Sequence, residues 1–292
     1  MQLDLLEPLS SVTDDSSKTN DPAPVQSIGE HFARIYAEYK KAADLWATSL
    51  SVLFNDEHEI LPCESYMQAI KTLDEYDIGQ IKAKVAGRIA ERLRRHAQKE
   101  FAPPGQNLSI DPSDLQEYFP TDREHADLFN PAALWDYLES HYGGNAGEKL
   151  AWEQGAKAVI EAFNLRRSDP LESKGGFIIL RDSIWCDDFA KKWHKRNTPS
   201  YSSQQGIRAC CYALATFCAW AEKPELAHDL KCLNNMFSDS HFGIESRKQY
   251  VCGTGDLVVV TFNKEFEYRL KQDLATQLNL FIGTYAPNHM RD

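Results

Sequence analysis

The chain contains none of the short motifs by which common enzyme classes are recognised. Its richest glycine segment, Tyr142–Lys149, follows a predicted helix rather than a strand, which does not fit the turns of nucleotide-binding folds. It has no H-E-x-x-H pair of zinc ligands and no G-x-S-x-G nucleophile turn. The acidic cluster Asp56–Glu59 is interpreted as a solvated loop rather than a metal site. The sequence therefore predicts no catalytic residue, no metal and no cofactor, although a site assembled from distant positions stays open.

Paired cysteines and long apolar runs are also missing. The seven cysteines show no C-x-x-C spacing, and an odd, scattered set favours reduced thiols and a cytoplasmic protein. The first eight residues lack the basic region of a secretory signal. The longest near-apolar run, Ala209–Ala221, has 13 residues, too few to cross a bilayer. We expect no membrane segment.

The composition is that of a globular protein. A chain of 292 residues with 42% hydrophobic and 26% charged residues is long enough for one large domain or two small ones. The net charge of −11 excludes a protein that binds polyanions over its whole surface. Any contact with nucleic acid must therefore come from a local basic patch.

The first third of the chain predicts a leader and a helical layer. Residues 1–26 are expected to be a disordered leader, since residues 7–26 are rich in Ser, Thr, Asp, Asn and Pro. Ser27 and Glu30 form a capping box for a long helix whose apolar stripe includes Ile35, Trp46 and Leu53. A short helix is expected over 64–73. A longer helix is expected over Ile78–Phe101, and Pro103-Pro104-Gly105 ends it. Residues 27–102 should pack as antiparallel helices.

The remainder, residues 108–292, predicts an α+β domain. Asp-Pro and Asn-Pro pairs start helices at Asp111 and Asn130, and the second helix should end near Tyr142. Further helices are expected over Gly147–Leu165, Gly206–Glu222, Pro224–Phe237 and Lys264–Ile282. Strands are expected over Gly176–Leu180, Gln249–Cys252 and Leu257–Phe262, the last two as a hairpin. The expected fold class is α+β, mainly α: an N-terminal helical layer followed by a small antiparallel sheet covered by helices.

The extreme N-terminus carries a short docking motif. Its residues are Gln2, Leu3, Asp4, Leu5 and Leu6. They resemble the pentapeptide by which bacterial polymerases and repair proteins bind the DNA sliding clamp, and only Leu6 departs, where that pattern has Phe. In this mode Leu5 and Leu6 fill an apolar pocket and the Gln2 amide makes directed hydrogen bonds. The alternative is a plain tail, or a first strand packed on the body.

A basic ladder follows the polar side of the predicted helix Ile78–Phe101. Opposite the apolar stripe of this segment we expect seven Lys and Arg residues against two Glu residues, and Lys82 and Arg94 belong to the seven. The ladder consists of Lys84, Arg88, Arg92, Arg95 and Lys99. Such a row can follow phosphates. The alternative is a solvated face that pairs with acidic neighbours.

A second basic group lies farther along the chain. It consists of Lys191, Lys192, Lys195 and Arg196, with Trp193 among them. An aromatic ring among cations can stack on a base. Asp187 and Asp188 partly offset the charge, and Trp193 as a core residue is the alternative.

The C-terminal part of the chain resembles a known family. The segment Tyr250–Leu257, Thr261-Phe262, and the helix Leu270–Ile282 with Asn279 are similar to that family's strand, Gly-polar-Gly turn, strand and helix with a Leu-Asn pair. The helix pair Leu134–Leu165, followed by Gly175–Ile179, fits as well. The family is a domain of unknown function from phages, plasmids and genomic islands, catalogued as methyltransferase-like. The resemblance spans about Asp127 to Pro287.

The resemblance has departures. Asp256 stands where the family often has His, and Arg166–Pro170 replaces a Lys-Thr-Asn-type segment. The resemblance implies a mobile-element setting in a bacterial host cell and work near DNA, but it transfers no catalytic residue. Asn130-Pro131-Ala132-Ala133 is a helix start and not the Pro-Pro-Tyr-type clamp of a DNA amino-methyltransferase.

Three functions are compatible with these patterns. The first is a non-enzymatic accessory protein of a phage or mobile element, tethered to the host sliding clamp and acting at or near DNA, by recruitment or by interference with host replication or defence. The second is a DNA-modification enzyme, associated with methyltransferases, whose site the motifs do not show. The third is an antagonist of a host enzyme whose acidic surface mimics DNA.

Overall fold

The computed structural model describes residues 27–60, 71–106, 108–118, 126–167, 171–187, 192, 195, 197–239 and 242–290. These contain seven α-helices and one five-stranded antiparallel sheet, which confirms the predicted mainly-α, α+β class. The helices are α1 (Ile28–Ile60), α2 (Glu75–Glu100), α3 (Pro131–Tyr142), α4 (Asn145–Ala162), α6 (Tyr201–Trp220), α7 (Pro224–Phe237) and α8 (Gln272–Tyr285). The strands are β1 (Glu172–Lys174), β2 (Phe177–Ser183), β3 (Lys248–Cys252), β4 (Leu257–Thr261) and β5 (Glu265–Lys271).

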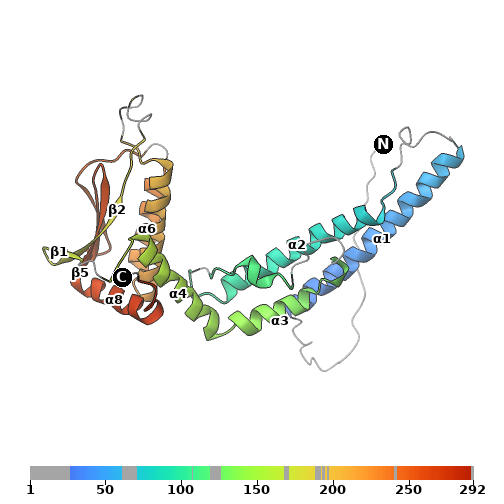
Figure 1. Ribbon diagram of the computed structural model, residues 1–292, viewed down its shortest axis with the longest axis horizontal. Coiled ribbons are helices and arrows are strands. Elements are labelled where there is room, and N and C mark those ends of the chain that lie inside the picture. The colour runs from blue at the N-terminus through green and yellow to red at the C-terminus, as the bar shows by residue number, and fades with distance from the viewer. Residues whose placement is uncertain are drawn as a thin grey trace, which may run out of the picture.

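Helices α1, α2 and α3 form an elongated arm (Figure 1). The predicted capping box starts α1: the Ser27 amide donates to the Glu30 carboxylate and the Glu30 amide donates to Ser27 Oγ, both at 3.1 Å. The arm is held by close packing, because an added Cβ at Gly29 would lie 2.6 Å from Trp135 Cβ. Tyr36, 1% exposed, donates to the Ala126 carbonyl at 2.7 Å and so ties α1 to the segment before α3.

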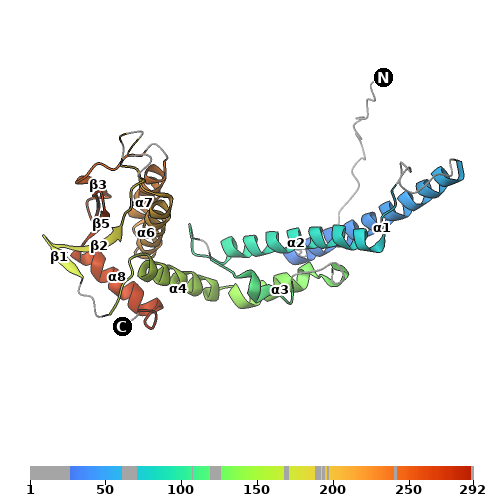
Figure 2. The ribbon, with the colours of Figure 1, turned by 45° about the horizontal axis from the view of Figure 1, so that its top comes forward.

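Helix α4 connects the arm to the C-terminal part of the molecule (Figure 2). The arm's hydrophobic core continues past Pro103–Asn107 and includes α3 and Ala151. The second core begins at Trp152, one residue later, and extends to Ala286. The two cores therefore meet within α4, while the predicted domain boundaries at 102 and 108 stay a prediction.

The C-terminal part is a sheet with helices packed on one face. The strand order is β1-β2-β5-β4-β3, and all neighbours are antiparallel. The expected hairpin is present as β3 and β4, with Cys252 opposite Leu257. Alternate residues of β5, Phe266, Tyr268 and Leu270, are 0% exposed and belong to the second core, where Phe266 packs edge-on against Phe237 of α7 and Tyr268 Oη lies 3.9 Å from Cys211 Sγ of α6.

Two sequence predictions were wrong. Lys264–Ile282 is not one helix, because Glu265–Lys271 is strand β5 and only Gln272 onward is helical. Its apolar residues satisfy both a helical and an alternating pattern, and pairing with β2 and β4 decides for the strand. Asp56–Glu59 is not a loop but the last turn of α1.

Other predictions are partly covered by the structure. The Asp111-Pro112 pair starts a 3-10 helix, Pro112–Leu115, and the Asp111 carboxylate accepts from the Ser113 amide. The predicted helix 64–73 lies mostly outside the described residues. Among the helices that the structure describes, none is long and apolar enough to cross a membrane.

Candidate nucleic-acid interface

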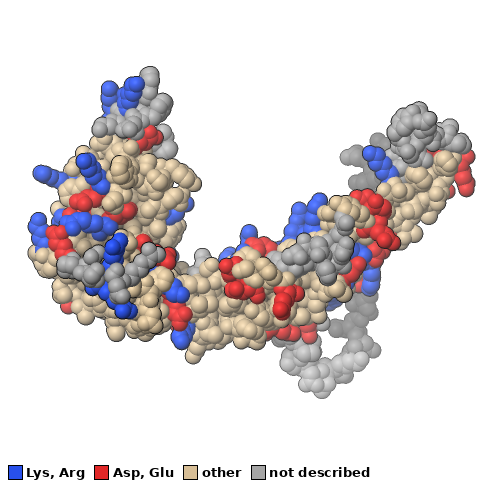
Figure 3. Space-filling model, viewed as in Figure 1, with Lys and Arg blue, Asp and Glu red and all other residues tan. Residues whose placement is uncertain are grey.

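The basic ladder lies on α2 and is exposed along its whole length. Lys84, Arg88, Arg92, Arg95 and Lys99 all point away from the arm's core, because the buried positions of α2 are on its opposite side. Lys and Arg atoms gather on the edge of the arm where α2 runs, between acidic patches (Figure 3). From Lys84 to Lys99 the helix rises by 15 steps, about 22 Å.

The ladder residues form few ion pairs. Among the described residues, Arg95 is its one member with an ion pair: Arg95 Nε donates to Glu91 Oε1 at 2.6 Å. Even so, the Arg95 side chain stays 71% exposed. An exposed pair of this kind is worth little, so a phosphate can compete for Arg95.

Two basic residues of the same helix have a structural role. Lys82 Nζ lies 2.9 Å from Asp44 Oδ1 and 3.3 Å from Asp127 Oδ1, and its side chain is only 9% exposed. Burial lowers the pKa of Lys82, but hydrogen bonds to the two carboxylates outweigh it, and the net shift is upward. The expectation that Lys82 lies on the open polar face is thus wrong.

Arg94 joins α2 to the segment after it. Its guanidinium donates to both Glu91 carboxylate oxygens, at 2.8 and 2.9 Å, and to the Ile110 carbonyl at 2.8 Å. The hydrogen bonds from Arg94, against the effect of burial, lower the pKa of Glu91 to about 2. Arg94 is therefore engaged inside the protein and is not part of the interface.

A hollow adjoins the ladder at Arg92. It has a volume of about 470 Å³ and is lined by Ile28, His31 and Phe32 of α1 and by Arg92 and His96 of α2. The His96 ring packs against Trp135 with their centroids 5.6 Å apart, which holds it in place. The sequence analysis missed this feature, because nothing in the spacing shows that the start of α1 meets the second half of α2.

The other predicted site residues are only partly visible. Lys192 and Lys195 are exposed, whereas Lys191, Trp193 and Arg196 lie outside the described residues. Lys195 has a positive φ of 56°. The docking motif Gln2–Leu6 also lies outside the described residues.

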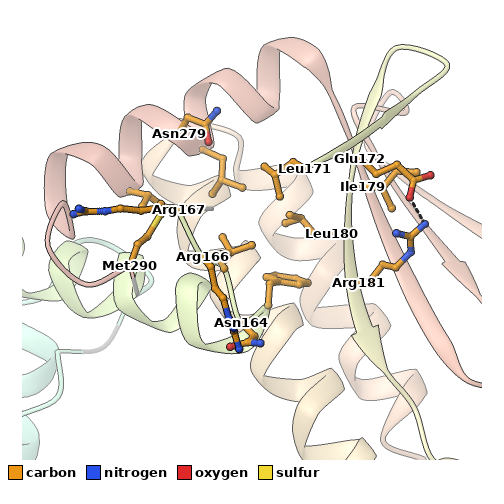
Figure 4. A pocket seen from close by; sticks show the side chains of 14 residues that line it. Asn164, Arg166, Arg167, Leu171, Glu172, Ile179, Leu180, Arg181, Asn279 and Met290 are labelled. Carbon is orange, nitrogen blue, oxygen red and sulfur yellow. Dashed lines mark ion pairs between the residues drawn. The ribbon is translucent and has the colours of Figure 1, made fainter. Parts of the chain in front are cut away.

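A separate pocket lies in the C-terminal part, between the end of α4, strands β1 and β2, and α8 (Figure 4). Its volume is about 650 Å³, and Arg166, Arg167 and Asn279 are among its polar lining residues. Arg167 Nη2 donates to the Pro287 carbonyl at 2.7 Å. Arg181, also at its edge, is paired with Glu172 at 2.5 Å and with Glu267 at 3.3 Å. The pocket holds guanidinium groups, but among the residues that the structure describes around it no nucleophile or acid–base pair converges on it.

The buried thiols are unsuited to nucleophilic catalysis. Burial raises the pKa of Cys211, Cys218 and Cys252 to about 12 and raises the pKa of Cys210 further still. At neutral pH they are protonated and serve as small apolar side chains. Among the residues that the structure describes, no group of three His, Cys, Asp or Glu side chains is arranged to hold a metal ion.

Comparisons with known proteins add no further identification. No family model, curated protein or solved structure matches the chain. The resemblance to the mobile-element family and to clamp-binding peptides therefore stays a prediction, and the site geometry is the basis for function.

Proposed function

We propose that the chain is an accessory protein of a phage or other mobile element, which acts at or near DNA and contacts nucleic acid through the ladder on α2. The observation that carries this proposal is the exposed row of five cations, of which only Arg95 has an ion pair among the described residues. In a chain with a net charge of −11, such a row confines polyanion binding to one orientation.

The hollow beside Arg92 favours a single strand over a duplex. A strand that follows the ladder places its phosphates along α2 and brings an unstacked base next to Phe32 and the two histidine rings. Stacking on aromatic rings contributes about 1–3 kcal/mol per base and tolerates any sequence. We therefore expect binding with little sequence preference and a strong dependence on salt.

The ladder can be tested with matched variants. Lys84, Arg88, Arg92 and Lys99 are replaced together by Ala, and binding of a fluorescent oligonucleotide is measured by anisotropy. Affinity should fall about 100-fold or more at low salt, since each phosphate contact adds to binding. The control, Lys157→Ala with Arg208→Ala, removes exposed charges from α4 and α6 and should change affinity little. Equal affinities for wild type and both variants would show that the ladder does not contact the oligonucleotide.

The second part of the proposal is that Gln2–Leu6 tethers the protein to the sliding clamp. The motif resemblance supports it, and the leader predicted from the composition of residues 7–26 would, as a random coil, have a reach of roughly 25 Å. Deletion of residues 1–8, or Leu5→Ala with Leu6→Ala, should abolish binding to a purified bacterial clamp without lowering the thermal midpoint. If the deletion binds the clamp as tightly as the full chain, Gln2–Leu6 is not the clamp-binding segment. The proposal that the ladder contacts nucleic acid would be unaffected.

An enzymatic role is the second candidate, and the pocket of Figure 4 is the observation in its favour. Arg166 and Arg167 suit an anionic ligand such as a nucleotide. A rise in the thermal midpoint with nucleotides or S-adenosylmethionine, lost in Arg166→Ala, would support this role. No shift with any of these ligands would count against it. The DNA-mimic alternative predicts no nucleic-acid affinity at any salt concentration.

A further inference from the structure

The pocket of Figure 4 has an apolar floor. Among the described residues that line it, eight are apolar, and Phe163 has the one aromatic ring among them. In Figure 4, Leu171 and Leu180 lie near the middle of the pocket, between α8 and the end of α4. The volume of about 650 Å³ is within the range of small-molecule sites, about 300–1,000 Å³. Five of the eight, here called the floor, are at most 8% exposed: Phe163, Ile179, Leu180, Leu278 and Ile282.

The wall that the segment after α8 contributes is held in place. Arg167 Nη2 donates a hydrogen bond to the Pro287 carbonyl at 2.7 Å. Two residues after Pro287, His289 Nε2 lies 2.9 Å from Glu161 Oε1 of α4. Met290, which lines the pocket, follows directly. Because these two contacts fix the wall in the absence of a ligand, binding requires little further ordering of the chain.

The charge of the pocket comes from guanidinium groups at its edge. The lining residues include three arginines against one glutamate. Arg181 is already paired, with Glu172 at 2.5 Å and with Glu267 at 3.3 Å. Arg166 is exposed and, within the part of the chain that the structure describes, has no ion pair. An anion at this edge can therefore pair with Arg166 without displacing a carboxylate.

The floor and the edge together select a ligand with two unlike parts. A nucleobase has polar atoms around its ring, and these lose hydrogen bonds when they are buried against aliphatic side chains. The two carboxamides that line the pocket, Asn164 and Asn279, are exposed and so belong to the edge rather than to the floor. An aliphatic chain has no such loss, and each methylene that it buries adds to binding.

We propose that this pocket binds an amphipathic anion, with its aliphatic chain on the floor and its carboxylate or phosphate head paired with Arg166. The proposal concerns binding and includes no reaction. It rests on neither the ladder nor the clamp motif, so failure of either of those tests does not affect it. A nucleotide, the ligand class of the enzymatic alternative, is the competing occupant.

Isothermal titration calorimetry with simple probes tests the ligand class. The full chain is titrated with hexanoate, octanoate, decanoate and octyl phosphate, and with octanol and AMP for comparison. Affinity should rise about threefold to fourfold for each methylene from hexanoate to decanoate, since each is buried on the floor. Octanol, which has the chain of octanoate without its charge, should bind about 10-fold more weakly. Either order of octanoate and octyl phosphate supports the proposal and identifies the preferred head group.

Variants separate the contact with the head from the contact with the chain. Arg166→Ala should weaken octanoate about 10-fold and leave octanol unchanged, because only the charged head contacts the guanidinium. Leu171→Ser, at a lining residue 40% exposed, should weaken both about 3- to 10-fold. Both positions are exposed, so the variants keep their fold, which far-UV circular dichroism verifies. Arg208→Ala, at an exposed arginine of α6 that does not line the pocket, is the control and should bind every probe as wild type does.

Three results would overturn the proposal. The first is no binding of octanoate, decanoate or octyl phosphate at millimolar concentration. The second is equal affinity of wild type, Arg166→Ala and Leu171→Ser for these probes, which would place their binding elsewhere on the molecule. The third is Arg166-dependent binding of AMP without binding of the aliphatic anions, which would identify a nucleotide pocket.

Discussion

The two ends of the molecule use the same amino acids differently. In the C-terminal part, aromatic residues are enclosed: Phe281 is 0% exposed and packs against Trp152, Phe217 and Trp220. In the arm, Trp46 of α1 is half exposed, and the five cations of the ladder on α2 are exposed as well. A buried aromatic residue stabilises the fold. Exposed rows of apolar or basic side chains are typical of surfaces that bind a partner.

The largest expected effect is at the centre of the C-terminal core. Phe281→Ala should lower the free energy of unfolding by about 3–5 kcal/mol, because it leaves a cavity among the rings of Trp152, Phe217, Trp220 and Tyr285. Leu280→Ala, one residue earlier and 61% exposed, should change it by less than about 0.5 kcal/mol. Urea denaturation followed by circular dichroism measures both. Similar losses for the two variants would show that this core is not packed as described.

A buried carboxylate in the C-terminal part predicts an unusual pH dependence. Burial raises the pKa of Asp182, whose Oδ2 has no hydrogen-bond partner, to about 6. Because its folded pKa exceeds the unfolded value of 3.8, its stabilising contribution is complete below pH 3.8 and is lost as pH rises through 6. Asp182→Asn should therefore be more stable than wild type above pH 7, by about 2–3 kcal/mol. A variant that is less stable at pH 8 would contradict this reasoning.

The arm should respond to pH in the opposite direction. Arg94 and Arg95 lower the pKa of Glu91 from 4.5 to about 2. A depressed pKa contributes stability that is complete above pH 4.5 and disappears as pH falls toward 2. Glu91→Gln should thus lower stability by about 1–2 kcal/mol at pH 7 and by little at pH 2. An equal loss at both pH values, measured by thermal denaturation, would argue against the ion pairs.

The sequence predicted those parts of the fold that depend on local chemistry. The Ser27–Glu30 box, the Asn130-Pro131 helix start and the β3–β4 hairpin are all confirmed, because caps and tight turns are set by neighbouring residues. Strand β5 was missed because its apolar residues fit two periodicities, and β1 because its three residues are polar and exposed. These two segments are strands because β1 pairs with β2, and β5 pairs with β2 and β4.

The candidate site was predicted in part for the same reason. The row of cations can be identified from helical spacing alone, but that Lys82 and Arg94 are engaged depends on Asp127 and Ile110, which lie far along the chain. The hollow beside Arg92 needs two helices to meet, and no sequence signal marks it. Contacts with residues distant in the sequence thus determine which cations of the helix remain exposed and able to bind a phosphate.

The most direct test of the nucleic-acid proposal is the salt dependence of binding to a single-stranded oligonucleotide. Wild type and the Lys84/Arg88/Arg92/Lys99→Ala variant are titrated between low and moderate salt, and log K is plotted against log salt concentration. Four lost phosphate contacts should make the slope less negative by about 3, with Lys157→Ala/Arg208→Ala unchanged from wild type. The same slope for wild type and the ladder variant would show that α2 does not contact the strand.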